Sequence, residues 1–341
     1  MAESVAAPAP RESAAARVGA FAARNRELSL AAVMVVLGAL VATQAPQLLS
    51  ASNLTQVTVL AAIIGVAAVG QSLVIITRNV DLSVESVIGL VAFVVADLLA
   101  RRILDIPAAI AFGIGLGLVL GMVNGVLVAF LRVPSIVATL GTLSIYRGID
   151  FFIAGGKQVT VGQLPPGYTD LARATFIGIP IFVWLAVVVI AISTVILRQT
   201  RFGRQVYAVG SNPEAATILG IRTRLVVFAV FSACGMLAGL TGVLWGMEFG
   251  TINATAATGV VLQVIAACVV GGVNIFGGSG TPVGAGLGAL FLAFISNALI
   301  LLRLSQFWLQ AIYGAVILIA VWVDAVLQRG LQRNTGGRSG G

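Results

Sequence analysis

Ten apolar runs dominate the chain and constrain its fold more than any other feature. A helical run of about twenty apolar residues is long enough to span a hydrocarbon core roughly 30 Å thick. Backbone N–H and C=O groups inside lipid must be bonded within their own segment, so such runs are helices and not open strands. Alternation at period two, which marks an outer-membrane barrel, is absent. The sequence therefore predicts an all-α, polytopic membrane protein with about ten transmembrane helices.

The spans divide the chain into one membrane domain with two short tails. Residues 1–28 are rich in Ala, Pro and Arg and predict a disordered N-terminal tail, 29–328 a transmembrane domain, and 329–341 a C-terminal tail. The predicted spans are 29–45, 54–77, 82–100, 107–131, 135–153, 176–197, 225–247, 259–275, 282–302 and 306–327. An even number of spans places both tails on the same side of the membrane.

Composition and charge exclude several classes of protein. The chain is 59% hydrophobic and 9% charged with a mean hydropathy of +1.07, which no soluble domain of this size shows. The net charge of +8 comes from cations at span ends, so lipid and membrane topology account for it better than nucleic acid does. With the N-terminus inside, fourteen of the 20 cations lie on the inside, which predicts cytoplasmic termini under the positive-inside rule. Histidine is absent and only two cysteines occur, so we expect no metal cluster, no disulfide framework and no enzyme.

Two sets of four spans, the second to fifth and the seventh to tenth, suggest an inverted repeat. The third member of each set carries three glycines at alternate positions followed by an asparagine: Gly113, Gly115, Gly117 and Asn124 in one, Gly284, Gly286, Gly288 and Asn297 in the other. Inverted repeats are common in transporters, which place the substrate path at the repeat interface. Glycine is frequent in this chain, with 40 residues, so a chance match is a serious alternative.

The loop 198–224 holds five arginines and one acidic residue between two long apolar runs. Its centre, NPEAATILG, predicts a short capped helix. Asn212 is a good N-cap, Pro213 fits the first helical position, and Gly220 can adopt the left-handed conformation that ends a helix. A compact basic helix outside the bilayer indicates that a soluble partner docks there.

Two polar stretches beside the apolar spans are candidates for a translocation path. TRNVDLSVESV (77–87) places Asp81, Ser83 and Glu85 at the entrance to the third span. Carboxylates in a membrane protein are costly and usually face the protein interior or water. The alternative is a helix start, in which Asp81 caps the helix and Arg78 neutralises its charge. The candidate path residues are Asp81, Ser83, Glu85, Asn124, Thr139, Thr142 and Asn297.

The second stretch, VPSIVATLGTLSIYRGI (133–149), has a small polar face that includes Thr139 and Thr142. Such a face can pack helices closely or line a wet path. Arg147 either reaches the outer surface or pairs with Asp150.

Further along the chain, the stretch VVGGVNIFGGSGTPVGAGLGAL (269–290) is rich in glycine but lacks the GK[ST] of a nucleotide-binding loop. It therefore predicts a tight turn, close packing or a broken helix.

Four motifs in order resemble the permease subunit of bacterial ABC importers for sugars, of the ribose, xylose and arabinose type. They are TRNVDLS (77–83), NGVLVAFLRVPSIVATLGTLSIYRG (124–148), FGRQVYAVGSNPEAATILGIRT (202–223) and AACVVGGVNIFGGSGTPVGAGLGA (266–289), and the resemblance covers roughly 27–329. The TRN form at 77–79 is more similar to the autoinducer-2 and rhamnose branch. Glu85 stands where many relatives have glycine.

The resemblance implies a mechanism and partners. The segment 212–220 would be the coupling helix that docks in a cleft of a separate ATPase, which carries ATP and Mg while this chain binds no cofactor. The matched coupling residues are Gly210, Asn212, Pro213, Glu214, Ala215, Ala216, Gly220 and Ile221. Other implied partners are an extracytoplasmic sugar-binding protein, a second permease copy or paralogue, and the bacterial inner membrane. The rivals are an ion-coupled secondary transporter, for which Asp81 and Glu85 would be the ionisable pair, and a non-transporting receptor or scaffold.

Overall fold

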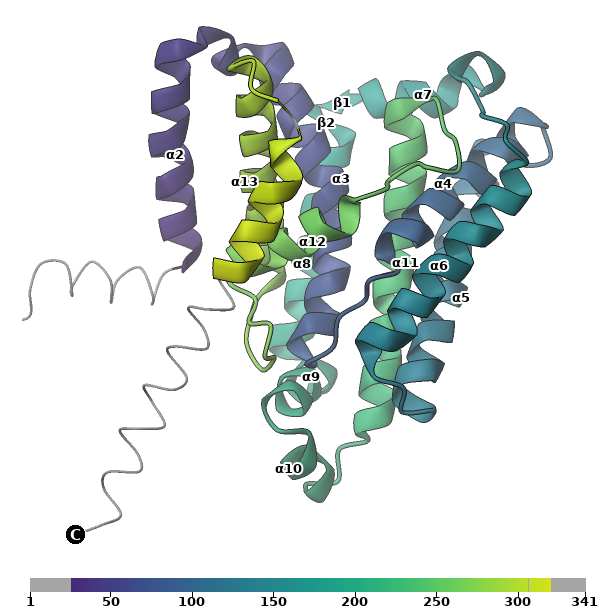
Figure 1. The fold of residues 1–341 in the computed structure, drawn as a ribbon, viewed down its shortest axis with the longest axis vertical. Coiled ribbons are helices and arrows are strands. Elements are labelled where there is room, and N and C mark those ends of the chain that lie inside the picture. Colours follow the sequence, from purple (N-terminus) through teal and green to yellow (C-terminus); the bar gives the residue numbers. More distant parts are fainter. Residues whose placement is uncertain (1–25, 306, 320–341) are drawn as a thin grey trace, which may run out of the picture.

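The computed structural model describes residues 26–305 and 307–319, and these form a bundle of helices (Figure 1). The predicted tails 1–28 and 329–341 lie almost wholly outside the described residues. The long helices are α2 (Arg26–Gln44), α3 (Ala51–Ile76), α4 (Val84–Ala100), α5 (Ile106–Gly125), α6 (Ser135–Ala154), α8 (Ile181–Gln199), α11 (Thr223–Phe249), α13 (Pro282–Leu301) and Trp308–Ile319. The shorter elements are η1 (Pro46–Leu49), η2 (Val126–Phe130), η3 (Val161–Gln163), α7 (Pro166–Arg173), β1 (Thr175–Phe176), β2 (Ile179–Pro180), α9 (Arg201–Ser211), α10 (Pro213–Ile218) and α12 (Val260–Val270).

Each predicted span overlaps a helix of the described residues, and the all-α membrane fold is confirmed. Of the tenth predicted span, 306–327, the structure describes the helix Trp308–Ile319, and 320–327 lie outside the described residues. Seven helices within the described residues are long and apolar enough to cross a membrane. The helices α4, with 17 residues, and α12, with 11 residues, are shorter. The predicted eighth span, 259–275, is therefore wrong in length, because α12 ends at Val270 and glycines with positive φ follow it. The sixth span begins at Ile181 and not at 176, because Gly178 and Pro180 belong to a hairpin.

The two ends of the bundle carry different elements (Figure 1). α9 and α10 project at one end, which we call the α10 end. The opposite end carries α7 and the β1–β2 hairpin. The loop 154–175 is ordered, since it contains η3 and α7, and Val159 forms an isolated bridge with Ile252. α2 stands at one edge of the bundle and packs on α13.

The packing follows the same plan in both predicted repeats. α3 ends and α11 begins at the α10 end, so these two first members run in opposite directions. Each is followed by a segment of turns and extended residues, 77–83 or 250–259, and then by a shorter helix, α4 or α12. The third member of each repeat packs on the first member of the other repeat: α5 packs on α11, and α13 packs on α3. The arrangement is that of two interlocked, inverted repeats.

The α5–α11 contact depends on close backbone approach. A Cβ atom added at Gly117 would meet the backbone of Gly235 and Gly239 on α11. Gly121 likewise faces Gly235, so the two helices interdigitate their small residues. Small residues at such a contact let helix backbones pack closely in lipid, where van der Waals contact replaces the hydrophobic effect. Gly115, on the same helix, has nothing within 4 Å of its added Cβ.

The β1–β2 hairpin precedes α8 at the end opposite α10. Thr175 pairs with Pro180 and Phe176 with Ile179, so Ile177 and Gly178 form the two-residue turn. Both turn residues have positive φ, +55° and +74°. A residue with a branched Cβ loses roughly 1–2 kcal/mol in this conformation, which Asn or Gly adopts readily.

The glycine contact predicts opposite effects for two substitutions on one helix. Gly117→Ala forces a methyl group into the α11 backbone, and we expect a loss of roughly 1–3 kcal/mol of stability. Gly115→Ala adds helix propensity in open space and should be neutral or stabilising by up to about 1 kcal/mol. Thermal unfolding of the two purified variants in one detergent measures the difference. Equal midpoints would contradict the close α5–α11 packing.

Candidate functional site

The short helix predicted at 212–220 is present as α10, and its caps are those expected. The Asn212 side chain accepts hydrogen bonds from the backbone N–H groups of Glu214 (3.1 Å) and Ala215 (3.0 Å). Pro213 occupies the first helical position, where its missing donor costs nothing. Gly220 has a φ of +79°, and a backbone bond from Ile221 N to Ala216 O (3.0 Å) closes the helix. These caps make α10 a rigid element although it has only six residues.

The helix α10 projects from the rest of the bundle (Figure 1), and apolar side chains are exposed at its tip. Ile218 is 86% exposed and Leu219 is 79% exposed. Ala216 faces inward and is buried, Ala215 is exposed, and Ile221 is half-buried. Exposed apolar side chains gathered at one place are a common mark of a contact site for another protein.

A helix that the sequence analysis missed, α9, supports α10. Thr200 caps it by accepting from Gly203 N (3.1 Å). Val206 and Val209 are buried on its inner face, while the arginines 201 and 204 are exposed. The signal was present in the sequence, because Phe202, Val206 and Val209 have the i, i+4, i+7 spacing of an amphipathic helix. The cluster of arginines made the whole segment resemble a loop.

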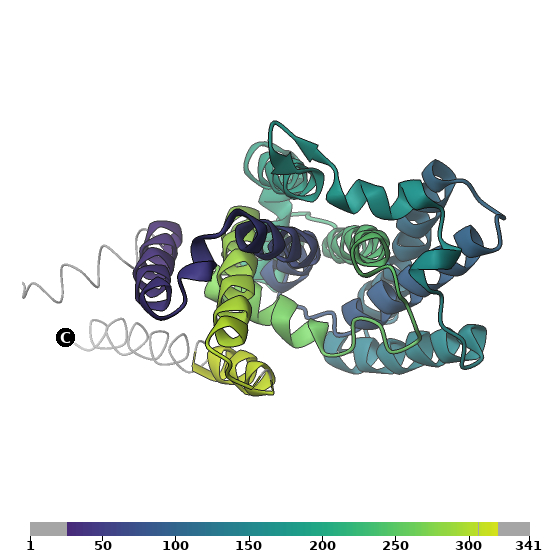
Figure 2. The same ribbon diagram turned by 90° about the horizontal axis from the view of Figure 1, so that it is seen from above.

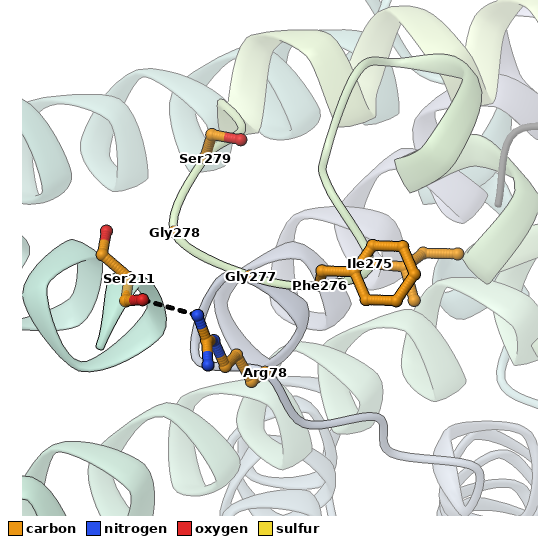
Figure 3. Close-up of a pocket in the computed structure, with 7 residues that line it drawn as sticks. All are labelled: Arg78, Ser211, Ile275, Phe276, Gly277, Gly278 and Ser279. Carbon is orange, nitrogen blue, oxygen red and sulfur yellow. Dashed lines mark hydrogen bonds between the residues drawn. The ribbon is translucent and has the colours of Figure 1, made fainter. Parts of the chain in front are cut away.

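The C-terminal end of α9 is fastened to the end of α3 by Arg78 (Figure 3). Its Nε donates to Gly210 O (2.6 Å) and its Nη2 donates to Ser211 O (2.5 Å). A guanidinium at the C-terminus of a helix pairs with carbonyls that have no intrahelical partner and with the negative end of the helix dipole. A Cβ at Gly210 would collide with Ile76 O, so glycine is required there. Arg78 therefore does not neutralise Asp81, and that interpretation of the sequence is wrong.

The glycine-rich loop 271–281 completes this junction. Gly278 N donates to Ile76 O (2.9 Å), and the Tyr207 hydroxyl donates to Gly280 O (2.7 Å). Burial raises the pKa of the Tyr207 phenol, which keeps this donor protonated. A pocket of 470 Å³ opens beside the junction (Figure 3). Its lining residues are Arg78, Ser211, Ile275, Phe276, Gly277, Gly278 and Ser279.

Three of the candidate path residues meet in one buried cluster. Asp81 Oδ1 accepts from Ser83 Oγ (2.7 Å) and Ser83 N (2.9 Å), and Asn124 Nδ2 donates to Ser83 Oγ (2.7 Å). All three side chains are at most 1% exposed. The cluster holds the extended segment 77–83 against α5, which carries Asn124. Asp81 does not form the N-cap of α4, because the helix begins three residues beyond it, at Val84, and Ser83 occupies the cap position.

The same segment is held from a second side by α6. Thr139 donates through its hydroxyl to Val80 O (3.3 Å), and Ser135 Oγ accepts from Val80 N (3.3 Å). The Thr142 hydroxyl donates to Thr139 O within α6. Gln71, oriented to satisfy both of its amide atoms, pairs with the backbone N and O of Asp81 at 3.2 Å each. The polar face predicted on the fifth span therefore bonds backbone groups of an extended segment.

Glu85 lies in a different place from Asp81. Its Oε2 accepts from Gly259 N (2.8 Å) and Val261 N (3.4 Å), at the N-terminus of α12. Its Oε1 lies 3.9 Å from Arg147 Nη2. A carboxylate at this position satisfies free N–H groups and complements the positive end of the helix dipole. The sequence could not separate Glu85 from Asp81, because its partners are more than 170 positions away.

Arg147 links α6 to the extended segment 250–259. Its Nη1 donates to Ala254 O and Ala256 O, both at 2.9 Å, and lies 3.7 Å from Asp150 Oδ2. The predicted pairing with Asp150 is confirmed, and the alternative of reaching the outer surface is wrong.

Asn297 is also separate from the Asp81 cluster: Asn53 Nδ2 donates to Asn297 Oδ1 (3.0 Å), and Asn297 Nδ2 donates to Asn53 Oδ1 (2.8 Å).

Comparison with known proteins shows what this chain is similar to. Residues 53–321 match a family model described as "Branched-chain amino acid transport system / permease component". The chain is 41% identical over 318 residues to the Autoinducer 2 import system permease protein LsrC of Salmonella typhi, covering 92% of this chain and 90% of that protein. It is 39% identical over 314 residues to the protein of the same description from Escherichia coli (strain K12 / DH10B), covering 92% and 91%. No solved structure matches the chain.

The Arg78 junction predicts that Arg78 stabilises the two helices α9 and α10, which together form the α10 arm, and that a similar arginine does not. Arg78→Ala removes two charged hydrogen bonds, and we expect a loss of roughly 1.5–3 kcal/mol together with faster tryptic cleavage of 198–224. Arg132 is the control. It also follows a membrane helix with positive φ and is exposed, but it has no hydrogen bond or ion pair with any described residue. Arg132→Ala should therefore leave the cleavage rate unchanged. Equal rates in both variants would show that Arg78 does not hold the arm.

Proposed function

We propose that a separate ATPase subunit drives this chain by docking on α10. The chain belongs to the permease-component family of ABC importers and is the transmembrane permease subunit of such an importer. The observation that carries this proposal is the exposed apolar tip formed by Ile218 and Leu219. Buried apolar side chains at the centre of an interface provide much of its binding energy. All five arginines of 198–224 are exposed, and they favour an acidic partner surface.

Movement of α10 would reach the membrane domain through the Arg78 junction. Asn212 and Pro213 join α10 directly to the end of α9, whose last carbonyls are bonded by Arg78. Arg78 is part of segment 77–83, which leads into α4, so a shift of α10 would displace α4. The bonds of the loop 271–281 carry the same shift to α12 and α13. Such a linkage shifts the balance between inward-open and outward-open states.

The path for the cargo belongs to this proposal. The Asp81, Ser83 and Asn124 cluster is buried in this conformation, but it sits on the segment that α10 would move. Alternating access would expose it in another state, together with the neighbouring Thr139 and Thr142 face of α6. Neutral hydroxyl and amide groups suit a hydroxyl-rich solute, and weak binding in the path favours release.

The remaining partners would contact the two ends of the bundle or lie beside it in the membrane. The α10 end would face the cytoplasm with both termini, and the opposite end would receive a solute-binding protein near 154–175 and 248–258, which are joined by the Val159–Ile252 bridge. A second permease, identical or related, would complete the path in the inner membrane. ATP and Mg would be bound by the ATPase subunit.

The proposed cargo is autoinducer-2 or a similar small sugar-like solute. It is supported by identity near 40% across nine-tenths of the chain with proteins described as autoinducer 2 import permeases. The family description names branched-chain amino acids, but that description covers a wider family.

The docking proposal predicts a selective loss of assembly. Replacing Ile218 and Leu219 together by Ser removes the apolar contact, and we expect ATPase binding to weaken about 30-fold, or roughly 2 kcal/mol. Leu131→Ser is the control, because Leu131 is 64% exposed but lies at the end of η2, outside α10. Affinity of the ATPase subunit for each variant in nanodiscs measures the effect. An unchanged affinity of the double variant, with the fold intact, would refute docking on α10.

The cargo proposal predicts one selective loss of uptake. A strain without this gene should fail to take up labelled autoinducer-2, while ribose, xylose, arabinose, galactose, rhamnose and leucine enter as in its parent. The intact gene should restore uptake, and a gene with Gly220→Pro, which the +79° φ at that position cannot accommodate, should not. Uptake that survives ATP depletion but needs a proton gradient would favour a secondary transporter instead. Partner binding without any uptake would favour a receptor.

A further inference from the structure

The β1–β2 hairpin has an apolar tip that its backbone conformation does not explain. Both turn residues have positive φ, as in a type I′ turn, where Asn-Gly is the preferred pair. Ile177 occupies the position of the Asn and is 77% exposed. Its neighbours Phe176 and Ile179 are 61% and 40% exposed. A branched apolar residue in this place is unfavourable for the turn and for contact with water, so a favourable contact outside the protein must offset both.

The hairpin is continuous with a helix surface that faces lipid. No charged residue occurs between Arg173 and Arg198. Within that stretch α8 has a mean hydropathy of 2.6 with 17% of its apolar window buried, so most of its sides face the hydrocarbon. Seen from above, the hairpin lies at the edge of the molecule beside α8 (Figure 2). Its apolar side chains thus extend the lipid-facing surface instead of forming a separate patch over the bundle.

Trp184 sets the depth of the hairpin in the membrane. The 19 residues of α8 span about 28 Å, close to the roughly 30 Å of a hydrocarbon core, so Ile181 lies near its boundary. Trp184, one turn further in, occupies the level at which tryptophan concentrates in membrane proteins. Its Nε1 donates to Phe176 O (3.1 Å), and the two rings meet edge to face with centroids 6.1 Å apart. The hairpin therefore folds back to the level of the lipid headgroups.

We propose that the β1–β2 hairpin is a membrane-interface anchor, with Phe176, Ile177 and Ile179 inserted between the headgroups and acyl chains of the leaflet opposite the α10 end. The occupant of this surface is lipid and not a protein. Insertion buries apolar side chains at the depth where amphipathic segments bind bilayers. It also fixes one end of α8, whose other end leads through Thr200 into α9 and the α10 arm.

A nitroxide label at the tip tests the proposal. Ile177→Cys is labelled in the full chain, because the native Cys234 and Cys268 are at most 1% exposed and stay unlabelled. Gly162→Cys is the control, on the same end of the bundle in η3, exposed and with nothing within 4 Å of an added Cβ. Both proteins are reconstituted into phosphatidylethanolamine and phosphatidylglycerol liposomes. Collision of the label with oxygen, which partitions into lipid, is compared with collision with a water-soluble nickel chelate.

We expect oxygen collisions to dominate at position 177 and nickel collisions to dominate at 162. A label at 177 as accessible to nickel as the control would overturn the anchor and leave the hairpin as a water-facing surface for a soluble partner. A second test places the label at Ile179→Cys and changes Ile177 to Leu or to Asn. Asn suits the turn, so the hairpin is preserved, yet the label should move toward water with Asn and stay in lipid with Leu. An unchanged depth with Asn would show that Ile177 does not anchor the hairpin.

Discussion

The rest of the structure depends on one constraint: polar backbone groups inside a membrane domain must find partners within the protein. Two non-helical segments, 77–83 and 250–259, interrupt the helices of the two repeats and bond only part of their own backbone. Side chains of neighbouring helices bond them. Ser135 and Thr139 bond Val80, and Arg147 bonds the carbonyls of Ala254 and Ala256. Several buried polar residues of this membrane domain, among them Gln71, Glu85 and Thr139, are explained by that requirement.

The same constraint gives the molecule a mechanical connection. A segment held by side chains can be released and bonded again, whereas a continuous helix moves as a rigid rod. Segment 77–83 contains Arg78, which bonds the end of α9, and it leads into α4. The element that a soluble partner would contact is therefore joined to a part of the first repeat whose bonding is not helical. The backbone groups of the two segments are bonded by side chains, and such bonds can be exchanged for others. This exchange allows the segments to move, as a transporter requires.

Sequence reasoning was most successful where the determinants are local. The apolar runs predicted all ten helices because length and hydropathy act on each segment alone, and NPEAATILG predicted α10 because its caps lie within nine residues. It failed where determinants are distant. Asp81 and Glu85 looked equivalent, but one bonds Ser83 and Asn124 and the other caps α12. α9 was hidden because its arginines outweighed the period of its buried face.

The sequence by itself determined the membrane class, the short capped helix and the family resemblance, since each depends on a contiguous run or motif. Tertiary structure alone decided which polar residues meet, that Arg78 serves α9 and not Asp81, and that Asn297 pairs with Asn53. The physical reason is that helices in lipid are stable one by one, so their existence is local. Their partners depend on which glycine faces allow close approach and on which backbone breaks must be bonded.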